Sequence, residues 1–160
     1  MLTLYLLRHA KASWDESKQD FERPLSSSGR KACAVIGEFI GEKGIDFDLV
    51  LVSTAVRTRE TIELIREHPK LRSEVRYDER IYEATVSQLL DVIAQVDSDR
   101  ESVLLVGHNP GIEELLALLT GEQQHVTTAN FAKIKLKATE WSASLANKGT
   151  LEWLVRPKEI

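Results

Sequence analysis

The sequence predicts an α/β fold of three layers, in which helices cover both faces of a mostly parallel central sheet. Short apolar runs at 3–7, 48–52 and 102–106 have the length and composition of interior strands. A stretch in which apolar residues recur at helical spacing follows each of these runs. Strands that alternate with helices along a chain are typical of a parallel sheet with helices packed on it.

From the N-terminus to residue 120, strands and helices are expected to alternate. The polar stretch 10–26 interrupts this pattern, and we interpret it as a long loop over the mouth of a binding site, with a plain surface loop as the alternative. The expected elements, in chain order, are a strand at 3–7, a helix at 26–41, a strand at 48–52, a helix at 54–67, a strand at 74–77, a helix at 87–96, a strand at 102–106 and a helix at 110–120.

Several of the expected helices have recognisable start and stop signals. Ser26, Ser27 and Ser28 offer caps for the first helix, and Gly41 and Gly44 can end it. The residue before a proline avoids helical backbone, so His68-Pro69 is expected to stop the second helix. Pro110 suits the first turn of the last helix.

The last third of the chain has a different pattern. Apolar and polar residues alternate over 129–137, which predicts a half-buried strand, and 151–155 is expected to be a final strand after a turn at 142–148. We expect these two strands to add to the sheet as antiparallel edges or a hairpin. Trp14 and Trp141 fit either a binding surface or core packing.

The composition is that of an ordinary soluble protein, and a single domain spanning 1–160 is expected. Apolar residues make up 42% of the chain, and the net charge of −4 argues against a nucleic-acid-binding surface. No apolar run reaches the roughly 18 residues of a membrane span. Cys33 is the only cysteine, which excludes an internal disulfide and fits a cytoplasmic location. Because histidine and cysteine residues show no zinc spacing, neither a metal nor another cofactor is expected.

Arginine and histidine residues follow three of the expected strands. Arg8 and His9 come directly after the first strand, Arg57 lies shortly after the second, and His108 comes after the strand at 102–106. Ligands of open α/β sheets bind outside the carboxyl ends of the strands. Two arginines and two histidines at one crevice therefore predict an anion site, with phosphate as the expected anion.

The sequences around these residues resemble a known family. Leu7-Arg8-His9-Ala10, the stretch 53–61 and Val106-Gly107-His108 are similar to the motifs of the histidine phosphatase superfamily. The small size of the chain, Ala10 after the histidine and the segment 20–30 resemble its SixA-type phosphohistidine phosphatase branch. The resemblance spans roughly residues 3–115 and implies a phosphoglycerate mutase-like fold.

Four residues acquire candidate roles from this resemblance and from their chemistry. His9 stands where the family carries the histidine that becomes phosphorylated, so it is the candidate nucleophile. Arg8 and Arg57 are candidate phosphate clamps, because a guanidinium presents paired donors to phosphate oxygens and stays charged. His108 can stabilise the phosphoryl oxygens in the transition state by donating a hydrogen bond.

Three further residues belong to the candidate site or compete for a place in it. Arg59 lies two residues beyond Arg57 but points elsewhere on the expected helix, and the family pattern selects Arg57. Asn109 opens a helix whose free N–H groups favour anions, so it is a candidate phosphate ligand. Glu83 resembles the acid glutamate of many family members and is the candidate proton donor, with a surface or capping carboxylate as its alternative.

These features predict a metal-independent phosphatase that acts through a phosphohistidine on His9. Its expected substrate is phosphohistidine on a protein, such as a phosphocarrier or histidine kinase domain. The chain lacks the long insertions that build substrate pockets in larger relatives, and an open site suits a protein side chain. Two alternatives stay open: a phosphatase of small phosphoesters, and a phosphate-binding regulatory module with little turnover.

Overall fold

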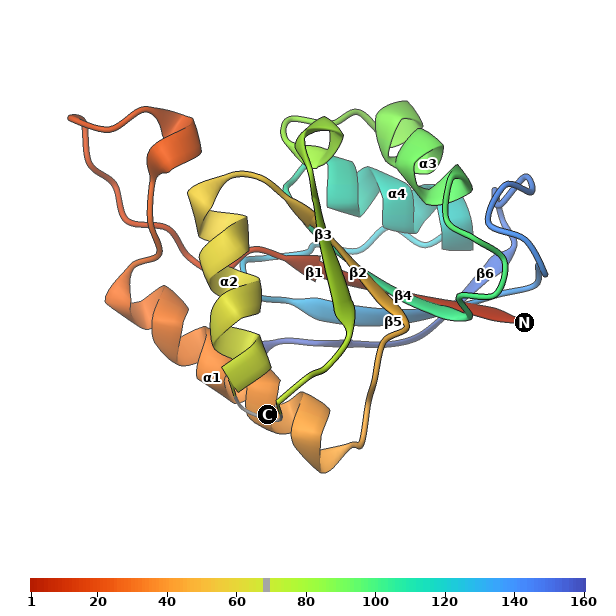
Figure 1. The fold of residues 1–160 in the computed structure, drawn as a ribbon, viewed down its shortest axis with the longest axis horizontal. Helices are drawn as coiled ribbons and strands as arrows, with labels where there is room; N and C mark the ends of the chain where they lie inside the picture. Colours follow the sequence, from red (N-terminus) through yellow and green to blue (C-terminus); the bar gives the residue numbers. More distant parts are fainter. Residues whose placement is uncertain (68–69) are drawn as a thin grey trace.

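Two layers of helices enclose a central sheet in the computed structural model, which describes residues 1–67 and 70–160 (Figure 1). The strands are β1 (Leu2–Arg8), β2 (Leu49–Ser53), β3 (Glu74–Asp78), β4 (Ser102–Gly107), β5 (Phe131–Leu136) and β6 (Gly149–Val155). The helices are α1 (Ser27–Glu42), α2 (Val56–Glu67), α3 (Val86–Ala94) and α4 (Gly111–Thr120). Each expected strand and helix is present, but the helix stop expected at His68-Pro69 lies outside the described residues.

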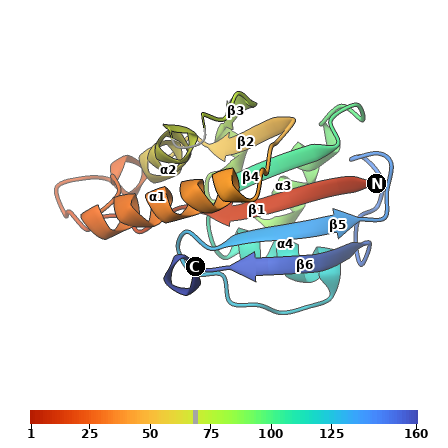
Figure 2. The ribbon, with the colours of Figure 1, turned by 90° about the horizontal axis from the view of Figure 1, so that it is seen from below.

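The sheet has the strand order β3-β2-β4-β1-β5-β6, which Figure 2 shows with the strands side by side. The pairs β2–β3, β2–β4 and β1–β4 are parallel. The pairs β1–β5 and β5–β6 are antiparallel, so the last two strands form a hairpin at one edge of the sheet. The expected fold class, a mostly parallel sheet with antiparallel C-terminal strands, is confirmed.

Alternate side chains of the interior strands enter two separate cores. From β1, Leu4 and Leu6 pack with residues of α3 and α4, whereas Tyr5 and Leu7 pack with residues of α1 and α2. Figure 1 shows these helix pairs on opposite sides of the sheet. A strand that is buried on both faces has a continuous run of apolar residues. The sequence pattern therefore identified β1, β2 and β4 directly.

The stretch 10–26 contains more structure than a plain loop. It holds a 3-10 turn at Asp20–Glu22 and an antiparallel bridge between Ala12 and Leu25. The sequence did not decide whether the two tryptophans lie in the core or on the surface, and the structure places one in each. Trp14, in this stretch, is 76% exposed, whereas Trp141 is 1% exposed and donates its indole N–H to the Arg100 carbonyl at 2.6 Å.

The carboxyl ends of the parallel strands meet at one edge of the sheet. In the β1–β4 pairing Arg8 lies opposite Gly107, and the His9 N–H donates to the Gly107 carbonyl at 3.1 Å. In the β2–β4 pairing Val52 lies opposite Val106, so Ser53 at the end of β2 reaches the same edge. This register positions the residues that follow the three strands beside one another.

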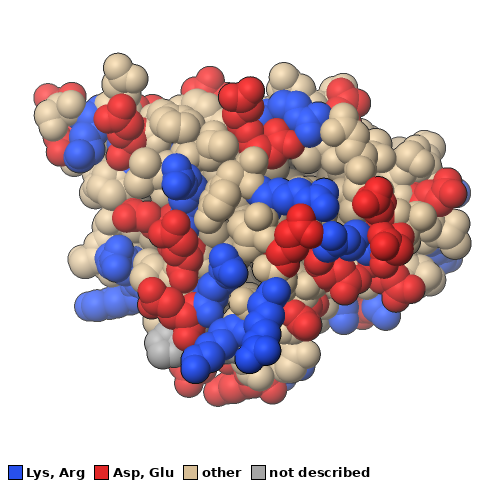
Figure 3. Space-filling view, in the orientation of Figure 1, with Lys and Arg blue, Asp and Glu red and all other residues tan. Residues whose placement is uncertain are grey.

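The surface over β3 and α2 carries interspersed basic and acidic side chains (Figure 3). Ion pairs such as Arg80–Asp78 and Arg100–Glu74, both at 2.6 Å, belong to the exposed part of the molecule. Among the described helices, none combines the length and the apolar character needed to cross a membrane.

Candidate active site

His9 lies directly beyond the end of β1 and is 8% exposed. Its Nδ1 donates to the carbonyl oxygen of Ala10 at 2.7 Å. A carbonyl can only accept a hydrogen bond, so Nδ1 carries the proton and Nε2 of the neutral ring keeps its lone pair. The Ala10 N–H in turn donates to Thr61 Oγ1 at 3.0 Å, which ties this peptide to α2.

Burial, together with the nearby positive charges of Arg57 and Arg8, lowers the pKa of His9 to about 4 against the opposing effect of the Ala10 hydrogen bond. The ring is therefore neutral at neutral pH. A neutral imidazole with a free Nε2 has the protonation state that a nucleophile requires.

Arg57 projects from the first turn of α2 and is 8% exposed. Its guanidinium donates to the Asp20 backbone carbonyl at 2.8 Å and to the Asp20 carboxylate at 3.0 Å. The competing Arg59 is exposed and lies over the Tyr77 ring at 5.3 Å. The structure therefore directs Arg57 toward the residues that surround the histidines and Arg59 toward β3.

Arg8 ends β1 and is half-buried. One of its terminal nitrogens donates to the Val126 carbonyl at 3.1 Å, while its buried Nε has no partner among the described residues. Burial lowers its pKa, Glu113 raises it and Arg57 lowers it, which shows that the charges of the two arginines act on one another. A shared anion between two guanidinium groups would relieve this repulsion.

His108 follows β4, and its ring centroid lies 5.2 Å from that of His9. Its Nε2 is 2.8 Å from Ser53 Oγ, and its buried Nδ1 has no partner in the described part of the chain. Burial, together with the positive charge of Arg57, lowers the pKa of His108 to about 3. His108 is thus neutral at neutral pH.

Asn109 and Glu83 occupy less central positions. The Asn109 amide nitrogen donates to Glu113 at 2.6 Å and to the Val126 carbonyl at 2.8 Å, so both of its hydrogens are used inside the protein. Glu83 is exposed, has a positive φ of 53°, and makes no side-chain hydrogen bond within the described residues. It follows Tyr82, whose ring centroid lies 5.4 Å from that of His108.

Asp20, Tyr82 and Ser53 surround the site, although the sequence did not single them out for it. The Tyr82 hydroxyl donates to Asp20 at 2.6 Å, and this bond together with Arg57 lowers the pKa of Asp20 to about 2. Ser53 had a usable signal, because it is a polar residue at the end of a buried strand. Asp20 and Tyr82 had none, since 62 residues separate them and only the fold brings them together.

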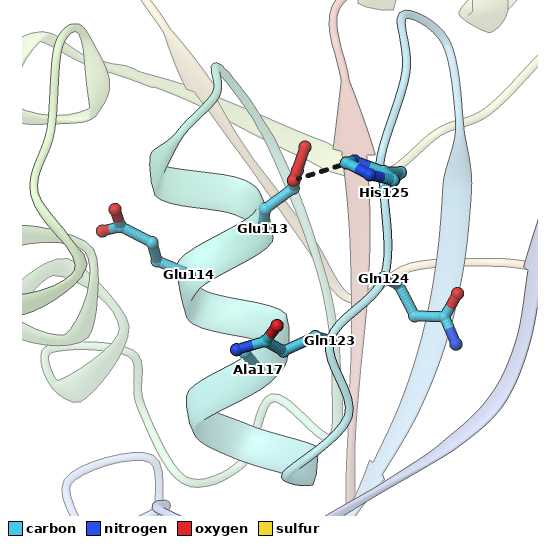
Figure 4. Close-up of a pocket in the computed structure, with 6 residues that line it drawn as sticks. All are labelled: Glu113, Glu114, Ala117, Gln123, Gln124 and His125. Carbon is cyan, nitrogen blue, oxygen red and sulfur yellow. Dashed lines mark ion pairs between the residues drawn. The ribbon is translucent and has the colours of Figure 1, made fainter.

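A hollow beside α4 adjoins this cluster through Glu113, which accepts from Asn109. Figure 4 shows Glu113 and His125 facing one another there, with 3.8 Å between Glu113 Oε1 and His125 Nδ1. The hollow is lined by residues of α4 and of the segment that follows it: Glu113, Glu114, Ala117, Gln123, Gln124 and His125. In residues 1–67 and 70–160, no group of three or more His, Cys, Asp or Glu side chains is arranged to hold a metal ion.

The arrangement around His9 can accept a phosphoryl group. Neutral His9 has a free Nε2, Arg8 and Arg57 supply fixed positive charge, and His108 has one ring nitrogen that is not used by the protein. Fixed donors of this kind stabilise the negative charge of a phosphoryl group in transfer.

Comparison with known proteins agrees with this geometry. A model of the histidine phosphatase superfamily (branch 1) matches residues 4–89. The chain belongs to the histidine phosphatase superfamily. As a member of this superfamily the protein is a phosphatase, and hence a hydrolase. An uncharacterized chloroplastic protein of Arabidopsis thaliana is 31% identical over 168 residues, which cover 96% of this chain and 77% of that protein.

Two solved structures extend the comparison to the whole of this histidine phosphatase. The proposed phosphohistidine phosphatase SixA from Nakamurella multipartitia has a TM-score of 0.86 and 28% identity, covering 98% of this chain and 96% of that one. The corresponding protein from Agrobacterium tumefaciens has a TM-score of 0.85 and 28% identity, covering 98% of each chain. The resemblance to the SixA type and the phosphoglycerate mutase-like fold are confirmed.

The lowered pKa of the buried His9 predicts how the stability of this histidine phosphatase depends on pH. Between the folded pKa of His9, about 4, and the ordinary value of 6.5, the unfolded chain binds a proton that the folded protein does not. The free energy of unfolding should therefore rise with pH up to 6.5 and fall as the pH is lowered through the folded pKa. The slope of the unfolding free energy against pH counts the protons taken up on unfolding. His9→Asn should reduce this number by about one between about pH 5 and 6.5, where few carboxylates titrate.

Urea denaturation of wild type and His9→Asn over this pH range measures the effect. Equal slopes for the two proteins would show that His9 is not held neutral by the folded structure.

Proposed function

We propose that this chain is a metal-independent phosphatase that removes phosphate from phosphohistidine on proteins through a phosphohistidine intermediate on His9. The observation that carries the proposal is the fixed protonation of His9. Its Nδ1 proton is held by the Ala10 carbonyl at 2.7 Å, so its Nε2 is available to attack.

The proposal includes the assignment of residues 1–160 to one domain. The position of β1 in the sheet, between β4 and the C-terminal hairpin, supports this assignment.

The reaction would proceed in two steps. In the first, His9 Nε2 forms a bond to phosphorus while the bond from phosphorus to the substrate nitrogen breaks. The substrate ring carries a proton on its other nitrogen, so it takes the electron pair and leaves as a neutral imidazole. In the second, water attacks phosphorus, the bond to Nε2 breaks, and inorganic phosphate leaves with the neutral His9 regenerated. Arg8 and Arg57 would hold the phosphoryl oxygens throughout, and His108 would donate to one of them.

The two arginines support a mechanism without a metal ion. A divalent metal in phosphoryl transfer neutralises the charge on the phosphoryl oxygens, and paired guanidinium groups supply positive charge to the same atoms. Both groups are fixed by the protein, Arg57 by Asp20 at 3.0 Å and Arg8 by Val126 at 3.1 Å.

Three features support phosphohistidine on a protein as the substrate. The SixA proteins with 28% identity are described as phosphohistidine phosphatases. A phosphorylated imidazole is a good leaving group, so it needs little help from a proton donor, and Glu83 is exposed without a fixed partner among the described residues. Trp14 and Phe21, in the segment that carries Asp20, are 76% and 38% exposed and available to contact a protein.

The buried free thiol of Cys33 supports a cytoplasmic location.

Arg57 and Arg59 provide a matched pair of variants. Arg57→Ala should lower kcat/KM by about 100-fold or more, because it removes a fixed donor from the transition state. Arg59→Ala should leave kcat/KM within about twofold, because surface substitutions away from a site have small effects. Steady-state kinetics on both proteins makes the comparison, and a larger loss in Arg59→Ala than in Arg57→Ala would contradict the assignment.

The substrate class can be tested with two kinds of phosphorylated compound. We expect the pure protein, with a chelator present, to dephosphorylate a phosphocarrier domain that bears phosphohistidine faster than a panel of small phosphoesters. Preference for an ester would indicate that the substrate is a small molecule, and Glu83 would then be needed as the proton donor to the leaving group. Loss of activity on addition of the chelator would refute metal independence, and no turnover on either kind of compound would favour a binding module.

A further inference from the structure

Ser53 is the last residue of β2, and its side chain is turned into the protein. It is 0% exposed, and its hydroxyl oxygen is 2.8 Å from Nε2 of His108. The backbone N–H of Ala55 donates to the same oxygen at 3.3 Å. The oxygen therefore already accepts one hydrogen bond from the backbone.

The direction of the bond between Ser53 and His108 follows from the remaining proton. A hydroxyl has one proton to donate, and a buried hydroxyl proton needs an acceptor. Within the described residues, His108 Nε2 is the acceptor that the Ser53 hydroxyl reaches. The Ser53 hydroxyl thus donates to Nε2, and Nε2 holds the lone pair.

This direction determines the tautomer of His108. In a neutral imidazole one ring nitrogen accepts and the other donates, so an accepting Nε2 leaves the proton on Nδ1. Nδ1 is the ring nitrogen that is buried without a partner in the described part of the chain. The opposite tautomer would present a lone pair at Nδ1, and phosphoryl oxygens, which are acceptors, would be repelled by it.

We propose that Ser53 is a positioning residue that fixes His108 as the Nδ1–H tautomer, so that the nitrogen left free by the protein donates to the phosphoryl group. The inference deepens the proposed function and rests on it for the role of the phosphoryl group. The tautomer itself is a property of the ligand-free protein and can be measured without any turnover.

The competing role for Ser53 is that of a cap for α2. The hydrogen bond from Ala55 at 3.3 Å is long for a cap, and the Thr58 hydroxyl lies 2.8 Å from both the Ser53 and the Ala55 carbonyl oxygens, so it donates to this corner without the Ser53 hydroxyl. The backbone at this corner is therefore held independently of the Ser53 hydroxyl, and Ser53→Ala should fold.

Nitrogen-15 NMR of the histidine rings distinguishes the two roles, because a protonated and an unprotonated ring nitrogen have well-separated shifts. At neutral pH, wild type should show His108 with the proton on Nδ1 alone. Ser53→Ala should show a mixture of the two tautomers, and Ser53→Thr, which keeps the hydroxyl, should retain the wild-type form. A proton on Nε2 in wild type, or an unchanged tautomer in Ser53→Ala, would overturn the proposal.

Kinetics supply a second, independent readout. Ser53→Ala should lower kcat/KM about tenfold, the equivalent of one hydrogen bond. In a His108→Ala background the same change should have no further effect, because Ser53 acts through that ring. The neighbouring Thr54→Ala is the control and should behave as wild type.

Full kcat/KM in Ser53→Ala, or an equal loss in the His108→Ala background, would overturn the inference. Absence of turnover in wild type would refute the proposed function instead. The NMR experiment would then still decide whether Ser53 fixes the tautomer.

Discussion

The parallel pairing of β1 with β4 brings the two candidate catalytic histidines together. Arg8 lies opposite Gly107, the His9 N–H donates to the Gly107 carbonyl at 3.1 Å, and the two histidine rings are consequently 5.2 Å apart. A shift of one residue in this register would turn the side chains of β1 to the other faces of the sheet. Because Leu4 and Leu6 fill one core while Tyr5 and Leu7 fill the other, the register that places the site also places both cores.

Burial and charge act together on the histidines that this register brings together. Burial lowers the pKa values of His9 and His108 to about 4 and about 3, and the positive charge of Arg57 contributes in the same direction. Neutral rings beside fixed cations form a site with excess positive charge, which a phosphoryl group can neutralise. The Asp20 carboxylate neutralises part of this charge through its ion pair with Arg57 at 3.0 Å.

The sequence predicted those parts of the molecule that depend on local pattern. Continuous apolar runs identified β1, β2 and β4, and the positions of Arg8, His9, Arg57 and His108 after them predicted which residues would meet. Contacts between distant segments were not accessible in this way. The bond from Tyr82 to Asp20 joins residues 62 positions apart, and no local pattern encodes it. Trp141 likewise is buried in a core formed by distant segments and donates to the carbonyl of Arg100, 41 residues away, so the sequence left the core and the surface as equal alternatives.

The central claim, a covalent phosphohistidine on His9, is tested most directly by trapping the intermediate. The protein would be mixed with a phosphohistidine-bearing protein, quenched with alkali within milliseconds and digested, and the phosphorylated peptide would be identified by mass spectrometry. The account predicts a phosphate that is stable in alkali and labile in acid, carried by the peptide that contains His9. Turnover of the substrate with no phosphate on that peptide, or with phosphate on a peptide containing His108, would contradict it.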